Sequence, residues 1–344
     1  MGQKINSKKA DISVLGAGSW GTALTIMLAN KGLNVKLWEF DKELSEQLIE
    51  TRKNDKFLPG VILPNNIFVT NELDEAVDAC DTVMFVVPSH VLRGVAKNTA
   101  DCGIKDKKII SATKGIENDT LLRMSEVLLE SIPGFSLDRF AVLSGPSFAT
   151  EVARSIPTTV VAASENDSFS MEVQDMFMCP SFRVYANADV TGVELGGSLK
   201  NVMAIAAGII DGIGWGDNTK AAMVTRAIVE MTRLGVKMGA KQLTFSGLAG
   251  VGDLILTCMG KHSRNLHVGR EIGKGKSLEV ILNEMVMVAE GVKTTKSVHQ
   301  LTRKLGVETP IMEKAYEILF ENKPPKDAVI ELMTREAKTE HPVE

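Results

Sequence analysis

Two groups of side chains in the second half of the chain are suited to chemistry on an anion. Lys200 precedes an almost wholly apolar run, Asn201 to Ile210, which predicts a buried helix with the lysine at its entry. An unpaired buried ammonium is costly, so Lys200 must reach water, a carboxylate or a ligand. Downstream, Ser263-Arg264-Asn265 offers a fork of donors suited to a phosphate. Each group has a simpler alternative, since Lys200 could extend along apolar surface to water and Arg264 could belong to a solvated basic face.

A glycine-rich stretch near the N-terminus has the pattern of a dinucleotide-binding turn. Gly16, Gly18 and Gly21 follow the short apolar run Ile12 to Leu15 and precede a helical pattern. Gly16 permits a tight turn, Gly18 lets the backbone approach a pyrophosphate, and Gly21 lets the helix pack closely on the strand. The pyrophosphate would lie on the free N–H groups at the helix N-terminus. The alternative is a glycine turn without a ligand.

An acidic residue follows the second strand pattern. Glu39 comes directly after the run Asn34 to Trp38, about twenty residues beyond the glycines, where a carboxylate can accept from the adenosine ribose hydroxyls. A carboxylate there would repel the extra phosphate of NADP(H). No arginine follows before Arg52, although Lys36 or Lys42 could neutralise the repulsion. We therefore expect a preference for NAD(H), with NADP(H) possible.

Strand and helix patterns alternate through the first half of the chain. This alternation predicts a parallel sheet, in which the loops after successive strands open at one edge. Two such loops, Thr113-Lys114-Gly115 and the segment 144–149, should therefore share a crevice with the glycine turn. The further strands expected are Ile67 to Thr70, Asp81 to Val87, Lys108 to Ala112, Phe140 to Leu143, Thr158 to Ala163 and Phe182 to Asn187.

The pattern changes near Ala188. From Val190 onward the sequence is rich in Gly, Ala and Met, with long helical stretches and no strand-like alternation. We predict an α/β protein with a Rossmann-like, mostly parallel sheet domain over residues 1–188 and an all-α substrate-binding domain over residues 189–344. The glycines from Gly247 to Gly252 do not predict a second dinucleotide turn, because no strand precedes them.

Composition narrows the function classes. The chain has 344 residues, a net charge of −4 and a pI near 5.9, so no overall basic field would bind nucleic acid or an acidic membrane surface. Met1 to Lys9 is polar, which predicts neither a signal peptide nor a membrane anchor, and we expect a cytoplasmic protein. The cysteines form no C-x-x-C pair, which favours a reducing compartment and argues against a metal site. They are Cys80, Cys102, Cys179 and Cys258.

A set of motifs is spread over most of the chain, namely Gly16 to Leu24, Thr113-Lys114-Gly115-Ile116-Glu117, Ser144-Gly145-Pro146-Ser147-Phe148-Ala149, Leu199-Lys200-Asn201, Gly216-Asp217-Asn218-Thr219-Lys220, Gly252-Asp253-Leu254, Ser263-Arg264-Asn265 and Ala289-Glu290-Gly291. In residues and in order, these motifs resemble those of the bacterial NAD(P)-dependent glycerol-3-phosphate dehydrogenases. Unrelated β-hydroxyacid dehydrogenases of similar architecture share only the first motif, so the whole set is specific.

The resemblance implies reversible hydride transfer between the nicotinamide and dihydroxyacetone phosphate, giving sn-glycerol 3-phosphate for phospholipid synthesis, in a homodimer. Lys200 would donate the proton in reduction, and Lys114 and Asp253 would complete the catalytic group. The implied substrate-binding residues are Lys114, Gly145, Ser147, Lys200, Asp253, Ser263, Arg264 and Asn265. The cofactor-binding residues are Gly16, Gly18, Ser19, Trp20, Gly21, Glu39, Lys114, Ala149, Arg264, Val288 and Glu290.

Catalysis by Lys200 near neutral pH requires a lowered pKa. An apolar helix and the cationic Lys114 would lower the pKa, whereas Asp253 would raise it, and the sequence leaves the balance open. Two other functions also remain open. A hydroxyacid or ketopantoate-type dehydrogenase would not need the Arg264 segment to bind phosphate. A nucleotide-sensing regulator without chemistry would be expected to lack Lys200 or Lys114, and both are present.

Overall fold

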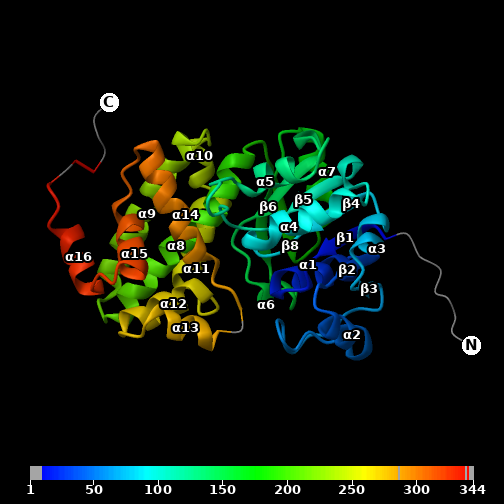
Figure 1. Ribbon diagram of the computed structural model, residues 1–344, viewed down its shortest axis with the longest axis horizontal. Coiled ribbons are helices and arrows are strands. Elements are labelled where there is room, and N and C mark those ends of the chain that lie inside the picture. Colours follow the sequence, from blue (N-terminus) through cyan, green and yellow to red (C-terminus); the bar gives the residue numbers. More distant parts are fainter. Residues whose placement is uncertain (1–9, 286, 338, 341–344) are drawn as a thin grey trace, which may run out of the picture.

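The N-terminal half of the chain is built on one twisted sheet with strand order β3-β2-β1-β4-β5-β6-β7-β8 (Figure 1). The computed structural model describes residues 10–285, 287–337 and 339–340. Among the strands that the structure describes, only β6 and β7 pair antiparallel, so the mostly parallel, Rossmann-like sheet predicted from the sequence is confirmed. The strands are β1 Ile12–Leu15, β2 Val35–Trp38, β3 Ile67–Thr70, β4 Thr82–Phe85, β5 Lys108–Ser111, β6 Phe140–Ser144, β7 Thr158–Ala163 and β8 Phe182–Asn187.

Helices cover both faces of this sheet. Strands β1, β4 and β6 are buried along their whole length, as the continuous apolar runs require. Successive side chains point to opposite faces, so that Met84 joins one core cluster while Val83 and Phe85 join the other. The helices are α1 Ser19–Asn30, α2 Lys42–Thr51, α3 Leu73–Asp78, α4 Ser89–Ala100, α5 Met124–Ser131, α6 Ala149–Val152 and α7 Asp167–Phe177, with 3₁₀ turns at Ile104–Asp106 and Leu137–Arg139.

The described residues after β8 are helical and form the part drawn on the left of Figure 1. The long helix α8 runs through its centre and is packed by α9, α11, α12 and α14. Helices α8 and α12 cross closely because a Cβ at Gly208 would lie 2.1 Å from the Leu266 carbonyl oxygen. The elements are α8 Val190–Gly212, α9 Asp217–Lys237, α10 Gln242–Phe245, the π-helix η3 Leu248–Gly252, α11 Asp253–Met259, α12 Arg264–Gly273, α13 Leu278–Glu284, α14 Glu290–Leu305, α15 Pro310–Phe320 and α16 Pro325–Met333.

The expectation that a buried helix starts after Lys200 is wrong, because Lys200 lies in the middle of α8. This helix begins at Val190, where the Asp189 side chain accepts from the N–H of Gly192 at 2.9 Å. The glycines before Lys200 do not mark a helix start. A Cβ at Gly196 would lie 2.2 Å from the Ala249 carbonyl oxygen, and one at Gly197 would lie 2.7 Å from Ser144 Oγ. They allow neighbouring elements to approach the helix.

Within the described residues, two helical stretches are long and apolar enough to cross a membrane by length and composition. They are Val190–Gly212 and Gln242–Met259. In the first, 94% of the most apolar window is buried inside the protein, which accounts for its hydropathy as that of a core helix.

Candidate active site

Three charged side chains meet where the sheet and the helical part join. Lys200 on α8 donates to Asp253 Oδ1 at 2.6 Å, and Lys114, which follows β5, donates to Asp253 Oδ2 at 2.8 Å. Asp253 at the start of α11 is 1% exposed, and Lys200 is 8% exposed. The structure therefore brings together the three residues that the sequence analysis placed in the catalytic group.

The balance that the sequence left open is decided by burial. Burial lowers the pKa of the Lys200 ammonium from its ordinary value to about 8. The negative charge of Asp253 opposes this shift, and the positive charge of Lys114 adds to it. A lysine with this pKa is partly deprotonated near neutral pH, as a group that both gives and takes a proton requires.

Thr257 is a fourth member of the cluster formed by Lys200, Lys114 and Asp253, and the sequence analysis did not identify it. Its Oγ accepts from Lys200 Nζ at 2.8 Å and donates to the Asp253 carbonyl oxygen at 2.6 Å. The available signal was spacing, since residues four apart on a helix lie on one face. Lys200 carries three ammonium hydrogens and has two acceptors among the described residues, so one N–H remains for a ligand.

The chain reaches α11 through a π-helix. Leu248–Gly252 is packed so tightly that a Cβ at Gly250 would lie 2.1 Å from the Phe245 carbonyl oxygen. π-Helical turns are often found at functional sites, where they redirect the side chains that follow. Here the turn leads directly into Asp253.

The glycine turn between β1 and α1 has the geometry of a phosphate-binding loop. Gly16 has φ +115°, and a Cβ at Gly21 would lie 1.9 Å from its carbonyl oxygen, so the fold itself needs both glycines. A Cβ at Gly18 would meet nothing within 4 Å, so the missing side chain leaves open space. No side chain in the described part of the chain caps the N-terminus of α1. The free N–H groups and this space fit the pyrophosphate of a dinucleotide.

Glu39 follows β2 and lies beside the glycine turn. Its carboxylate accepts from the Asp41 N–H at 2.9 Å, and the side chain is buried. Burial raises the pKa of the Glu39 carboxyl, and backbone hydrogen bonds from Asp41 and Ala17 partly oppose the shift. The contact with Ala17 places the carboxylate at the turn rather than at a solvated strand end.

Glu290, the first residue of α14, reaches across to the sheet part. Its carboxylate accepts from the Ser89 N–H at 3.1 Å and from Ser89 Oγ at 2.6 Å. Ser89 begins α4, just beyond β4, and was not singled out in the sequence. Burial raises the pKa of the Glu290 carboxyl, while the Ser89 hydrogen bonds lower it.

The three adjacent residues proposed as phosphate donors differ in what they contact. Ser263 Oγ caps α12 by accepting from the Leu266 N–H at 3.2 Å. Asn265 is buried, donating to Asn201 Oδ1 at 2.9 Å and accepting from the Gly291 N–H at 3.0 Å. The Arg264 side chain is exposed and makes no hydrogen bond or ion pair to any residue that the structure describes. Only the guanidinium therefore has all its donors available.

The remaining predicted residues make simpler contacts. Ser19 donates to the Phe57 carbonyl oxygen at 2.6 Å, and the buried Trp20 Nε1 has no partner within the described chain. Ser147 Oγ donates to the Gly145 carbonyl oxygen at 3.0 Å. Ala149 begins α6, and Val288 is 39% exposed.

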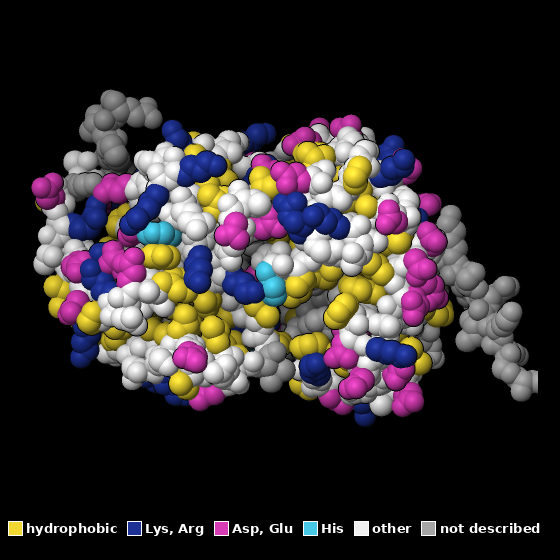
Figure 2. All heavy atoms as spheres, in the orientation of Figure 1, with side chains coloured by type: hydrophobic (Ala, Val, Ile, Leu, Met, Phe, Trp, Pro, Cys, Tyr) yellow, Lys and Arg dark blue, Asp and Glu magenta, His cyan; other side chains and the backbone are white. Residues whose placement is uncertain are grey.

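The site follows one edge of the sheet. Strands β2, β1, β4, β5 and β6 are neighbours and parallel, so their carboxyl ends lie in a row. Along this row come Glu39, Gly16, Ser89, Lys114 and Gly145. Figure 2 shows a hollow at the junction of the two parts, with Lys, Arg and His side chains at its edge.

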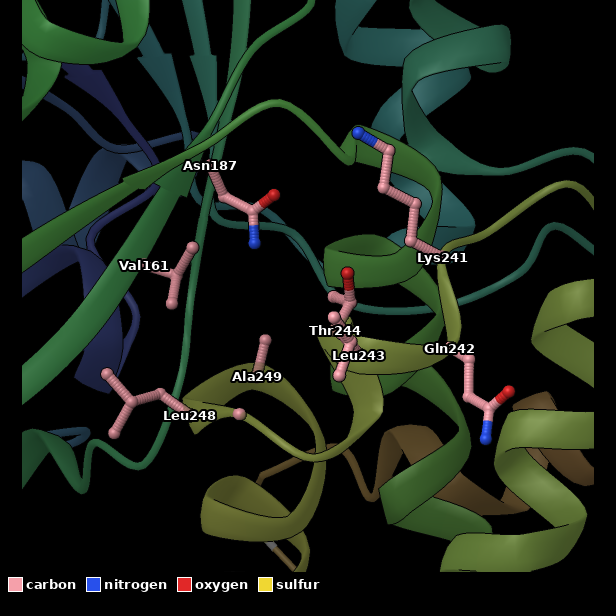
Figure 3. Close-up of a pocket in the computed structure, with 9 residues that line it drawn as sticks. Val161, Asn187, Lys241, Gln242, Leu243, Thr244, Leu248 and Ala249 are labelled. Carbon is pink, nitrogen blue, oxygen red and sulfur yellow. The ribbon is translucent and has the colours of Figure 1, made fainter.

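Two further cavities lie away from this row. One of about 380 Å³ is lined by residues that include Val161, Asn187 and Thr244, with Ala249 of the π-helix on its wall (Figure 3). The other, of about 1590 Å³, lies among α8, α9, α15 and α16. Neither is lined by Lys200, Lys114 or Asp253, so volume alone does not locate the chemistry. The described residues contain no His, Cys, Asp and Glu group that could hold a metal ion.

A Rossmann-like sheet with a phosphate turn, joined to a helical part that supplies a buried lysine, defines the class of two-part dinucleotide-dependent dehydrogenases. Comparison with known proteins identifies the family. Residues 11–170 match the NAD-dependent glycerol-3-phosphate dehydrogenase N-terminus, and residues 189–330 match the C-terminus of the same family. The chain therefore belongs to the NAD-dependent glycerol-3-phosphate dehydrogenase family.

Individual relatives agree with this assignment. The glycerol-3-phosphate dehydrogenase [NAD(P)+] of Geobacter sp. (strain M21) is 53% identical over 329 residues, covering 96% of this chain and 98% of that protein. The crystal structure of glycerol-3-phosphate dehydrogenase from Coxiella burnetii has a TM-score of 0.91 at 37% identity, covering 96% of this chain and 100% of that one. A ketopantoate reductase from Ralstonia eutropha is 15% identical with a TM-score of 0.59, covering 93% and 99% of the chains, and shows the shared fold alone.

Proposed function

We propose that this protein catalyses reversible hydride transfer between NAD(P)H and dihydroxyacetone phosphate, giving sn-glycerol 3-phosphate for glycerophospholipid synthesis. The observation that carries the proposal is the Lys114–Asp253–Lys200 cluster, whose first member lies on the same sheet edge as the phosphate turn. Bound nicotinamide cofactor would supply the hydride in one direction and accept it in the other. The chain's own residues then have to bind and orient the substrate and the cofactor and to transfer a proton.

Lys200 is the proposed proton donor in reduction and the acceptor in oxidation. Negative charge builds on the carbonyl oxygen as it is reduced, so an ammonium aimed at that oxygen stabilises the transition state. Asp253 and Thr257 fix Lys200 Nζ by two hydrogen bonds and leave its third N–H for the substrate. Lys114 supplies a second cation from the opposite side of the same carboxylate.

The phosphate of the substrate is proposed to bind Arg264. Its guanidinium is a planar donor suited to a phosphate, and it has no hydrogen bond to another described residue. Asn265 and Ser263 hold the start of α12 in place through the contacts described above. We keep Gly145, Ser147, Lys114, Lys200 and Asp253 as further substrate-binding residues, since they surround the same corner of the site.

NAD(H) is the proposed preferred cofactor, with NADP(H) also usable. The burial of Glu39 and its contact with Ala17 favour a carboxylate facing the ribose hydroxyls, where it would repel an added phosphate. The other proposed cofactor residues lie along the same edge or on the facing helices. They are Gly16, Gly18, Ser19, Trp20, Gly21, Lys114, Ala149, Arg264, Val288 and Glu290.

We also propose a homodimer that works in the cytoplasm, without nucleic acid or a membrane anchor. In this proposal residues 1–188 form the domain that binds the cofactor, and residues 189–344 form the domain that binds the substrate. Strands end at Asn187 and α8 begins at Val190, which supports this division. The acidic net charge of −4 supports a small anionic substrate bound at a locally basic site rather than a polyanion.

The decisive experiment follows NADH absorbance with dihydroxyacetone phosphate. We expect steady oxidation of NADH, and reduction of NAD⁺ when sn-glycerol 3-phosphate is offered. Turnover of ketopantoate or another ketoacid instead would assign the chain to a different dehydrogenase activity. NADH binding without turnover of any of these substrates would support a nucleotide-sensing regulator.

A further inference from the structure

The contact between Ser89 and Glu290 joins the two parts of the molecule at the end of β4. Helix α4 begins at Ser89 after Pro88 and has no capping side chain of its own. The carboxylate that accepts from its first N–H comes from α14, 201 residues further along the chain. A carboxylate at a helix N-terminus is favoured by the free N–H groups and the helix dipole. The helical part thus supplies the cap for a helix of the sheet part.

The position of the Ser89–Glu290 contact along the sheet edge indicates which part of a bound dinucleotide would lie beside it. Glu39 follows β2, the glycine turn follows β1, Ser89 lies beyond β4 and Lys114 beyond β5. Neighbouring strands are about 4.8 Å apart, so three spacings cover about 14 Å from Glu39 to Lys114. A dinucleotide with its adenosine ribose at Glu39 and its pyrophosphate at the turn has its nicotinamide end beside Ser89 and Glu290.

We propose that Ser89 is a positioning residue for the nicotinamide end of the cofactor, because its hydroxyl and N–H hold the Glu290 carboxylate at that end. Two hydrogen bonds, one to each carboxylate oxygen, fix the orientation of the group. The carboxylate keeps lone pairs that can accept from a carboxamide or a ribose hydroxyl. This inference rests on the proposed function only in assuming a nicotinamide dinucleotide as the cofactor.

The loop that contains Lys114 also packs closely against Ser89. A Cβ at Gly115 would lie 2.6 Å from Ser89 Oγ and 3.6 Å from Glu290 Oε2. The backbone of Gly115 is in turn held by Ser198 Oγ, which accepts from its N–H at 2.9 Å. Ser89 therefore lies between the Lys114 loop and Glu290, with little room to change its rotamer. This packing keeps the Ser89 hydroxyl in its hydrogen bond to the Glu290 carboxylate.

Other contacts tie the two parts together independently of Ser89. Ser297 on α14 donates to the Ile116 carbonyl oxygen at 3.0 Å, and Arg123 forms an ion pair with Glu194 at 2.8 Å. Loss of the Ser89 hydroxyl should therefore leave the two parts together. Ser297→Ala is a matched control, because it removes a buried hydroxyl that joins the same two parts without touching Glu290.

The test compares two probes by calorimetric titration, NADH and ADP-ribose, which lacks the nicotinamide. We expect Ser89→Ala to raise the Kd for NADH about 10-fold, equivalent to about 1.4 kcal/mol, with the Kd for ADP-ribose unchanged. Ser89→Ala should add nothing in a Glu290→Ala background, because the serine acts through Glu290.

The proposal is overturned if Ser89→Ala weakens NADH and ADP-ribose equally, if it leaves NADH binding unchanged, or if Ser297→Ala has the same selective effect. These titrations need no substrate. A protein that shows the selective loss but does not reduce dihydroxyacetone phosphate would contradict the proposed function while supporting the role of Ser89.

Discussion

Helix α8 carries two buried charges that differ in how fully they are paired. Glu194 accepts from Arg123 Nη1 at 2.8 Å and from the N–H and Oγ of Ser125, both at 2.7 Å. Among the described residues, Lys200 has two acceptors for its three ammonium hydrogens. Three protein donors hold the Glu194 carboxylate and suit it to stabilising the fold, whereas Lys200 keeps an N–H that can donate to a ligand.

The surroundings of Glu194 and Lys200 also differ. Glu194 binds residues of the sheet part that precede and begin α5, and its side chain is 2% exposed. Lys200 shares one carboxylate with a second cation, so the cluster carries an excess of positive charge. Burial alone therefore does not distinguish a charge that can act on a ligand from one that holds the fold together. Incomplete pairing does, and variants at the two sites should therefore fail in different measurements.

Removal of Lys200 should have the largest effect on turnover. We expect Lys200→Ala to reduce kcat by roughly 10²-fold or more, the usual scale for a lost general acid, with the fold and cofactor binding retained because Asp253 keeps Lys114 as its partner. Steady-state kinetics with dihydroxyacetone phosphate measure this. Lys220→Ala is the matched control, since Lys220 is held by Asp211 outside the site. Near wild-type turnover in the Lys200 variant would exclude Lys200 from the mechanism.

Substitution of Glu194 should instead lower the stability of the fold. Breaking a buried pair by removing one partner costs about 3–5 kcal/mol, so Glu194→Ala should lower the urea midpoint and Tm strongly. Glu126→Ala removes a carboxylate that pairs with the same Arg123 at 3.0 Å but is 36% exposed, and should change them little. Equal losses in the two variants would show that the burial of Glu194 contributes nothing special.

Arg264 tests whether a free donor in the crevice serves the substrate. Loss of a charge-assisted hydrogen bond costs about 1.5–3 kcal/mol, so Arg264→Ala should raise the KM for dihydroxyacetone phosphate by about 10-fold or more. The effect should be smaller for dihydroxyacetone, which lacks the phosphate. Arg270→Ala is the control, because Arg270 is already engaged by Asp211 at 2.9 Å. Equal losses for the two substrates would assign Arg264 to the cofactor or the fold.

The pH profile should report the environment of Lys200. Reduction needs the ammonium, so its rate should be full below a pKa of about 8 and fall as the pH rises through that value, while oxidation should show the opposite trend. Lys114 contributes to the lowered pKa, so the residual activity of Lys114→Met should show its inflection at higher pH. Reduction that is independent of pH from 7 to 9 would remove Lys200 as the titrating group.

Glu39 should give the smallest effect, on selectivity rather than rate. We expect Glu39→Ala to shift the ratio of kcat/KM for NADH and NADPH toward NADPH by about 10-fold, because repulsion of a phosphate is removed. Asp41→Ala, which removes the carboxylate paired with Lys56 at 3.6 Å, is the control. A wild-type preference for NADPH, or an unchanged ratio in the variant, would show that Glu39 does not face the ribose.

The sequence by itself determined the sheet and the glycine turn after its first strand. Continuous apolar runs predicted the buried strands, and the glycine spacing predicted the phosphate turn, because both follow from local backbone geometry. The motif resemblance also placed Lys200, Lys114 and Asp253 in one catalytic group. These inferences depend on local patterns or on a motif set that runs through most of the chain.

Only the tertiary structure decided the extent of α8, the sign of the Lys200 pKa shift, and the contacts of Thr257 and Ser89. Gly196 and Gly197 resembled a helix start in sequence, but they are small because Ala249 and Ser144 approach from elements far away in the chain. The pKa depends on how completely α8 is enclosed, and the Ser89–Glu290 contact joins residues 201 positions apart. Burial and long-range pairing are properties of the packed chain, and no local pattern encodes them.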